Sequence, residues 1–180
     1  MTDYFFDSRD EFARLQLQAR VWEPSAEAML DQIGLLDDDF FFSMEDVDLG
    51  WRAQLAGWRC LYTPKAIVYH HLSATGGGAT ASYHDGRNLI YVLVKNYPSD
   101  LWKRYWRPIL RAQWRLAAEA LRAWRGEAAR ARLRGMLVGL FAIPRFRRKR
   151  QVVQALRVVS AEYLESILIP PSTGVTSTSD

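Results

Sequence analysis

The sequence predicts an α/β fold followed by a C-terminal helical region. Two short runs rich in β-branched and aromatic residues, Trp58–Tyr62 and Ala66–His70, are typical of strands, and Thr63 and Pro64 separate them. Helical periodicity precedes these runs and dominates almost everything after Ser99. With 180 residues, of which 49% are hydrophobic, the chain can bury a core but is too short for two large domains.

The first part of the chain predicts one clear helix. Residues 1–24 are weakly patterned, with only a hint of a short helix before Pro24. A helix over Ser25–Ile33 is expected to begin with Ser25 as its N-cap. Gly34 is expected to end it, because glycine adopts the left-handed conformation that follows the last helical turn.

A second helix is predicted after the acidic aromatic run LDDDFFF. Ser43 is placed to cap it, because Glu45 and Asp46 then fall in its first turn, where carboxylates favour the positive end of the helix dipole. Gly57 is expected to end it. The apolar residues that recur at helical spacing and are expected to face the core are Met44, Val47, Trp51 and Leu55.

The two predicted strands lead into a glycine-rich loop, Ser73–Ser82. A helix from about Tyr83 to Asn96 follows, and it is expected to stop before Pro98. These elements place the loop between a strand and a helix, where polar side chains can meet a ligand.

From Ser99 onward the pattern is strongly amphipathic. Pro108 is expected to start a new helix or to kink this one, and Gly126 and Gly135 punctuate the later part. A cationic block over residues 145–150 precedes a last helix that ends near residue 168. The apolar face carries Trp102, Tyr105, Trp106, Ile109, Leu110, Ala117, Leu121 and Trp124, and the basic face carries Lys103, Arg104, Arg107, Arg111, Arg115 and Arg122.

Charge is segregated along the chain. The 24 Lys plus Arg and 20 Asp plus Glu leave a net charge of +4, but six carboxylates lie within residues 37–48, whereas arginines crowd between Arg104 and Arg157. This order predicts an acidic site in front and a phosphate-seeking or membrane-seeking surface behind. Cys60 is the single cysteine, which excludes an intrachain disulfide and makes a reducing compartment the default.

The residues with the clearest chemistry are three carboxylates, Glu45, Asp46 and Asp48, at the start of the second helix. A carboxylate that removes a proton from an attacking hydroxyl must be ionised and aimed by a rigid element, which a helix N-terminus supplies. The alternative is that these residues only cap the helix and line the surface. Spacing by itself does not decide between the two.

Two histidines, His70 and His71, end the second predicted strand. Adjacent strand residues point to opposite faces, so at most one of them faces the site. A carboxylate with an imidazole suits a divalent cation, Mg²⁺ or Mn²⁺, bound to phosphates. The alternative is a hydrogen-bonded core histidine.

Three stretches carry a family resemblance, namely MLDQIGLLDDDFFFSMEDVDLGWRAQLAGW, LYTPKAIVYHHLSAT and RNLIYVLVKNYP, which together span about residues 28 to 98. They resemble the acceptor-side half of bacterial family 2 glycosyltransferases, inverting enzymes of the GT-A fold that include the rhamnosyltransferase-like group. The resemblance implies a partial GT-A (nucleotide-diphospho-sugar transferase) fold. It also implies transfer of a sugar from a nucleotide-sugar donor to a hydroxyl of a saccharide or polyprenyl-linked acceptor in cell-envelope polysaccharide synthesis.

The resemblance assigns roles to particular residues. It implies that Asp46 is the general base for the acceptor hydroxyl, that Glu45 supports it, and that His70 helps to bind the metal and the leaving diphosphate, with His71 as the fallback. The residues implied to bind acceptor or donor, or to hold the elements that do so, are Asp48, Arg52, Trp58, Ser73, Thr75 and Arg87. For Arg87 and its neighbour Asn88, a phosphate contact and a buried helix clamp both stay open.

The family's N-terminal nucleotide-binding half has no counterpart here, since about 27 residues precede the matching region. We therefore expect a truncated or internally deleted member. The expected domains are a partial catalytic domain over 1–97, an amphipathic basic helical extension over 98–169 and a disordered tail over 170–180. Activity of this chain without the missing half is in question.

The basic amphipathic pattern indicates where in the cell the protein is located. A tryptophan-rich basic amphipathic helix can lie in a membrane interface, so we expect a peripheral protein on the inner, cytoplasmic face of an anionic plasma membrane. The alternative is a helix packed on its own domain. Nucleic-acid binding is disfavoured because the tryptophans follow one helical face and form no stacking platform. The alternative to an enzyme is a catalytically inactive remnant.

Overall fold

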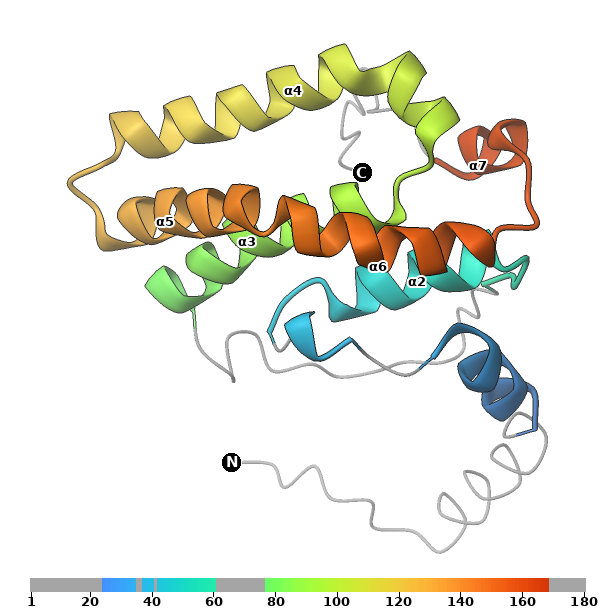
Figure 1. Cartoon of the computed structure of the whole chain (residues 1–180). Helices are drawn as coiled ribbons and strands as arrows, with labels where there is room; N and C mark the ends of the chain where they lie inside the picture. Colours follow the sequence, from blue (N-terminus) through green and yellow to red (C-terminus); the bar gives the residue numbers. More distant parts are fainter. Residues whose placement is uncertain (1–23, 35–36, 41, 61–76, 169–180) are drawn as a thin grey trace, which may run out of the picture. The chain divides into compact units, whose positions relative to one another are not determined.

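The computed structural model describes residues 24–34, 37–40, 42–60 and 77–168, and every regular element among them is a helix (Figure 1). Residues 1–35 and 36–180 form two compact units. The first unit contributes a helix over residues 24–33. The elements of the second are a 3₁₀ turn η1 (Asp38–Phe40) and the helices α2 (Glu45–Leu55), α3 (Gly78–Asn96), α4 (Ser99–Arg122), α5 (Glu127–Phe141), α6 (Ile143–Ala155) and α7 (Ala161–Ile167).

The predicted α/β class, and with it the GT-A architecture, is contradicted, because the described ranges contain no β-strand. Trp58, Arg59 and Cys60, which begin the first predicted strand, have irregular backbone. The rest of that run and all of Ala66–His70 lie outside the described residues. A strand needs a neighbouring strand to satisfy its backbone groups. At the end of α2 the packed elements are instead α4, α6 and α7.

The helix of the first unit ends as predicted. Gly34 has φ 78° and its backbone N–H donates to the Leu30 carbonyl over 2.7 Å. Glycine tolerates this left-handed conformation without the penalty that a Cβ would impose. The sequence prediction of a helix stopped at Gly34 is confirmed.

The start of α2 differs from the prediction. Ser43 does not cap the helix, because its backbone has φ 67° and its Oγ donates to Oδ1 of Asp85 over 2.6 Å. Met44 occupies the N-cap position with φ 63° and no side-chain hydrogen bond. The predicted cap is therefore wrong, and the hydroxyl instead ties this turn to α3.

The end of α2 follows the prediction. Gly57, with φ 87°, donates to the Gln54 carbonyl, and Trp58 N–H donates to the Ala53 carbonyl, which is the Schellman pattern. Of the expected core residues, Leu55 is buried and Trp51 and Met44 pack against the core, but Val47 is 44% exposed. Val47 was therefore wrongly placed in the core.

Helix α3 ends at Asn96, just before Pro98, as predicted, but it begins at Gly78 instead of Tyr83. The residues Gly78–Ser82, expected to lie in the glycine-rich loop, are therefore helical. Helix α3 packs lengthwise against α5 (Figure 1). That packing compensates for the conformational entropy that glycine loses in a helix.

The α3–α5 contact depends on glycines that let the two backbones approach. A Cβ built on Gly135 would lie 2.0 Å from the Tyr83 carbonyl oxygen, and one on Gly86 would lie 2.6 Å from the Arg132 carbonyl oxygen. Gly135 thus lies inside α5 at a close approach to α3, so the prediction that it punctuates the chain is wrong.

Replacing Gly135 with alanine is expected to lower the free energy of unfolding by about 1–3 kcal/mol, because the added methyl group would overpack the interface. Urea unfolding followed by circular dichroism measures the change. The control is Gly50→Ala in α2, where a Cβ meets nothing within 4 Å. That variant is expected to raise stability by about 0.5–1 kcal/mol, so equal effects at the two positions would contradict the close approach.

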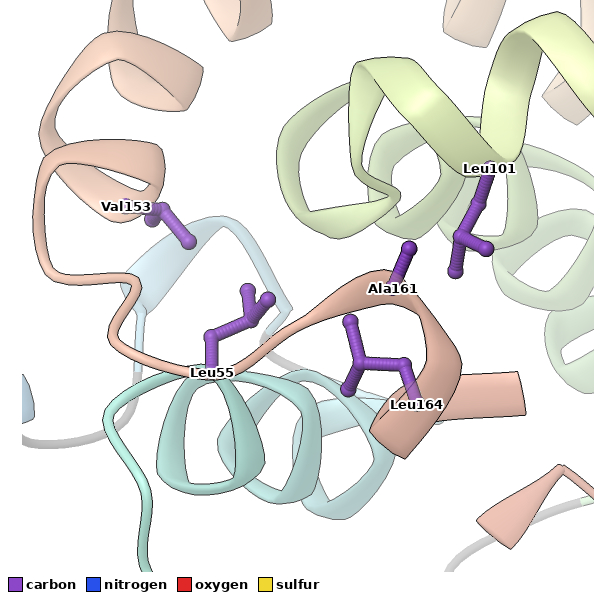
Figure 2. Close-up of a cluster of buried hydrophobic side chains, with 5 residues drawn as sticks. All are labelled: Leu55, Leu101, Val153, Ala161 and Leu164. Atoms are coloured by element: carbon purple, nitrogen blue, oxygen red, sulfur yellow. The ribbon is translucent and has the colours of Figure 1, made fainter. Parts of the chain in front are cut away.

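Two apolar clusters hold the second unit together. In the first, side chains from α2, α4, α6 and α7 point toward one another (Figure 2): Leu55, Leu101, Val153, Ala161 and Leu164. In the second, Tyr91 stacks on Phe146 with ring centroids 3.8 Å apart, and Phe40 meets Tyr91 edge-on at 5.9 Å. The second cluster fixes η1, and hence the acidic residues around it, against α3 and α6.

The later helices confirm the predicted helical region but shift its boundaries. Helix α4 runs through Pro108, which therefore does not start a new helix. The cationic block lies within α6, and the last helix ends at Ile167, close to the predicted position. Contacts of α3 with α5 and α6 cross the expected domain boundary at residues 97 and 98, and the domain division stays a prediction. None of the described helices combines the length and the apolar character that a membrane span requires.

Candidate functional site

The acidic segment, residues 37–40 and 42–48, packs against α3 and α6 through buried charges. Asp48 is 0% exposed and accepts hydrogen bonds from Arg52 Nε over 2.9 Å, Lys95 Nζ over 2.9 Å and Asn96 Nδ2 over 2.7 Å. Arg52 lies one turn away on α2, whereas Lys95 and Asn96 come from the last turn of α3. A buried carboxylate is tolerated when its lone pairs are satisfied in this way.

Asp37 extends this network toward α6. Its carboxylate lies 2.7 Å from Lys95 Nζ and 2.6 Å from Lys149 Nζ. Lys149 also donates to Asp39 over 2.6 Å, and Arg145 pairs with Asp39 as well. Four basic side chains from three helices therefore neutralise the three carboxylates of this cluster, Asp37, Asp39 and Asp48.

The protonation behaviour follows from these contacts. Burial by itself would raise the pKa of Asp37, but the hydrogen bonds from Lys149 and Lys95 outweigh it and lower the pKa to about 2. Burial would lower the pKa of Lys149, but its hydrogen bonds to Asp37 and Asp39 raise it. The lowered pKa of Asp37 and the raised pKa of Lys149 both mean that this pair is favoured in its ionised form.

Acid is expected to weaken this cluster. The pKa of Asp37 is lower in the folded protein than its ordinary value of 3.8, so its stabilisation is complete above that value and is lost as the pH falls toward about 2. The loss is about 2 kcal/mol. Urea unfolding of the wild type and of Asp37→Asn between neutral pH and pH about 2 measures it, and the two stabilities should converge at the acid end. Asp38→Asn, at an exposed neighbour, is the control for removing one carboxylate from the segment, and an Asp37→Asn curve parallel to that of the wild type would contradict this role.

Arg87 and Asn88 of α3 hold the turn before α2. Asn88 Nδ2 donates to the carbonyls of Phe42 and Ser43, each over 2.7 Å, and Arg87 Nη2 donates to the Asp39 carbonyl over 2.9 Å. These contacts fix a backbone in which two successive residues other than glycine, Ser43 and Met44, adopt positive φ. The geometry is that of the helix clamp left open by the sequence, whereas a phosphate contact of Arg87 stays a prediction.

Asp46 lies in the first turn of α2 directly after this clamped turn, and it is exposed. Its Oδ1 accepts a hydrogen bond from the backbone N–H of Val47 over 2.8 Å, which orients the carboxylate. The neighbouring Glu45 has a buried Oε2 with no hydrogen-bond partner among the described residues. The two carboxylates thus differ from Asp48, because neither is neutralised by a cation in the described part of the structure.

The remaining predicted site residues divide into three groups. Asp48 and Arg52 belong to the buried network, with 0% and 4% of their surface exposed, so the geometry favours the role of holding the helix. Trp58 is half-buried beyond the end of α2. Residues outside the described ranges are His70, His71, Ser73 and Thr75, and the structure does not relate them to Asp46.

The possible ligands among the described residues are not arranged to bind a divalent cation. No group of three or more His, Cys, Asp or Glu side chains within these ranges is arranged to hold one. The carboxylates that lie closest together are instead bonded to lysine and arginine. A metal-binding role of His70 stays a prediction.

Sequence reasoning missed the basic partners of the acidic segment. Lys95 is 3% exposed, and Lys149 and Arg145 come from the cationic block that was assigned to a phosphate-seeking or membrane-seeking surface. One signal was present: Lys95 follows Tyr91 and Val92 at helical spacing, so it lies on the buried face of α3. A lysine on such a face needs an acidic partner.

Comparison with known proteins connects part of this chain to a glycosyltransferase. The chain is 37% identical over 73 residues to N-acetylglucosaminyl-diphospho-decaprenol L-rhamnosyltransferase of Mycobacterium tuberculosis, in strain CDC 1551 / Oshkosh and in strain ATCC 25618 / H37Rv. The match takes up 40% of this chain and spans about a quarter, 24%, of each relative. No protein-family model matches the chain, and no solved structure matches it.

Proposed function

We propose that this chain carries the acceptor-side part of an inverting family 2 glycosyltransferase. It acts on a nucleotide-sugar donor and on a hydroxyl of a saccharide or polyprenyl-linked acceptor in cell-envelope polysaccharide synthesis. The observation that supports this proposal most is the identity of 37% over 73 residues to a rhamnosyltransferase whose name gives a diphospho-decaprenol acceptor. The exposed Asp46 on a clamped helix N-terminus supplies the chemical group that such a transfer needs.

In the proposed reaction, Asp46 accepts the proton of the acceptor hydroxyl. The hydroxyl oxygen then attacks the anomeric carbon of the donor, the bond from that carbon to the diphosphate breaks, and its electron pair leaves with the diphosphate. A base aimed by a helix N-terminus and oriented by one hydrogen bond needs little rearrangement before it acts. Glu45, whose Oε2 has no partner among the described residues, supports the acceptor or Asp46.

In this proposal Ser73 and Thr75 contact the donor, and His70 contacts the leaving diphosphate. A divalent cation, Mg²⁺ or Mn²⁺, would supply charge neutralisation for the diphosphate when bound. We also propose a peripheral position on the inner face of the plasma membrane. The support for it is α4, where large apolar side chains such as Trp106 and Leu121 are exposed beside arginines.

A transfer assay tests the proposal. The full chain is incubated with nucleotide-activated rhamnose and N-acetylglucosamine linked to a polyprenyl diphosphate, with and without Mg²⁺ or Mn²⁺. A parallel arm adds the donor-side portion of the mycobacterial relative in trans. Formation of the disaccharide lipid in either arm is expected. Absence of product in both arms, while the full-length relative reacts under the same conditions, would overturn the proposal.

A second candidate is a catalytically inactive helical module that binds membranes, and the exposed tryptophans of α4 favour it. Flotation with anionic vesicles, compared with retention of single-stranded DNA, separates membrane binding from nucleic-acid binding. Vesicle binding without transfer in the assay above would favour this module. Retention of DNA without flotation would contradict the expectation that nucleic acid is not a partner.

A further inference from the structure

The most prominent unexplained feature of the second unit is a cavity of about 660 Å³ beneath α4. Residues of α3, α4, α5 and α6 line it, and most are apolar, among them Ile90, Trp102, Trp114 and Leu140. Only Leu101 and Ala120 of α4 are buried, and neither lines the cavity. The α4 side chains that do line it therefore form one wall of the cavity without filling it. The volume lies within the range of about 300–1,000 Å³ that is usual for sites of single small ligands.

A second, polar pocket of about 510 Å³ adjoins this cavity and shares Ser99, Lys103 and Arg150 with it. Its charged lining comprises Lys103, Arg150 and Arg157 against the single carboxylate of Asp100. Asp100 is paired with Arg157 through two hydrogen bonds of 2.9 Å, and Arg150 donates to carbonyls at the end of α3. Lys103 is exposed and has no ion-pair partner within the described ranges, so it is available to an anion.

An apolar cavity that opens into a cationic pocket suits an amphiphile with one apolar chain and an anionic head. We propose that the cavity binds the isoprenoid chain of a polyprenyl diphosphate lipid and that the pocket around Lys103 binds its diphosphate. The chain would be stabilised by removal from water and the head by charge-assisted hydrogen bonds. This inference rests on the proposed function, because it assigns a place to the lipid part of the acceptor.

Binding of geranylgeranyl diphosphate to the full chain tests the inference, with the fluorescence of Trp102 and Trp114 as the signal. Geranylgeraniol lacks the head and inorganic pyrophosphate lacks the chain. Each is expected to bind at least about tenfold more weakly than geranylgeranyl diphosphate. The alcohol lacks the hydrogen bonds to the diphosphate, and pyrophosphate lacks the burial of the apolar chain. Equal binding of the alcohol and the diphosphate lipid, or no saturable binding, would overturn the inference.

Two variants with matched controls locate the site. Lys103→Glu is expected to weaken binding at least about tenfold, whereas Arg111→Glu, the same charge reversal on α4 outside both linings, should leave it within about twofold. Ala117→Phe fills the cavity and should weaken binding similarly, whereas Ala112→Phe on the exposed face should not. Equal weakening by the two charge reversals would show diffuse attraction to anions and would refute the site. Lys103 is exposed, so its variant keeps the test valid if Ala117→Phe does not fold.

Lipid binding can be measured independently of glycosyl transfer. Binding is measured without donor, and Asp46→Asn is expected to bind the lipid as tightly as the wild type. Lipid binding without any glycosyl transfer would count against the proposed function alone. Transfer with unchanged kinetics in Lys103→Glu and Ala117→Phe would count against the cavity alone. Displacement of geranylgeranyl diphosphate by phosphatidylglycerol vesicles at equal lipid concentration would assign the cavity to bulk membrane lipid and overturn the inference.

Discussion

Asp46→Asn is expected to lower kcat for glycosyl transfer by about 10²–10⁴-fold, with KM little changed. Asparagine has nearly the shape of aspartate but cannot accept the proton of the acceptor hydroxyl. The fold should persist, because Asp46 is exposed and its single described hydrogen bond, Oδ1 to the Val47 N–H, can be kept by the amide oxygen. The transfer assay gives the rate, and circular dichroism with urea unfolding verifies the fold.

The control for this substitution is Asp38→Asn. Asp38 is also exposed and lies in the same acidic segment, so its variant changes the local charge by the same amount. We expect its kcat to stay within about twofold of the wild type, since an exposed charge that does not take part in the reaction makes a small and screened contribution. Equal rates for Asp46→Asn and the wild type would refute the assignment of the base.

Asp48→Asn, two residues further along α2, is expected to act on stability instead. Asp48 is 0% exposed and accepts from Arg52, Lys95 and Asn96. An amide in its place carries no charge and presents an NH₂ group to these donors. The free energy of unfolding should therefore fall by about 3–5 kcal/mol, the usual consequence of removing one partner from a buried charge network. The measurement is urea unfolding followed by circular dichroism.

The same substitution at exposed Asp38 should change the free energy of unfolding by less than about 0.5 kcal/mol. Lys95→Met in the Asp48→Asn background is informative as well. It removes the lysine that would otherwise lose one of its two carboxylates, so the double variant should be more stable than the sum of the single effects predicts. Strict additivity would show that Lys95 and Asp48 do not interact as the structure indicates.

Several features were predictable from local sequence. Glycines at the ends of helices, such as Gly34 and Gly57, and the proline that stops α3 act through backbone constraints on one or two residues. The first turn of α2 with its carboxylates was likewise predictable. These constraints need no knowledge of which segment packs on which.

Other features required contacts that local sequence does not contain. Ser43 gives up a capping role for a bond to Asp85, which lies 42 positions away. Gly135, which sequence alone suggested as a break, is placed at a close approach of two helices. In each case tertiary packing outweighs a weak local preference.

The sequence by itself determined where the helix of the first unit, α2 and α3 end, and that a set of carboxylates surrounds the start of α2. Only the tertiary structure decided which of these carboxylates is neutralised. Asp46 and Asp48 are two positions apart and have the same ionisable group, yet α3 brings Lys95 and Asn96 to Asp48 and leaves Asp46 exposed. The physical reason is that burial and ion pairing depend on distances between segments far apart in the chain, which short-range patterns do not encode.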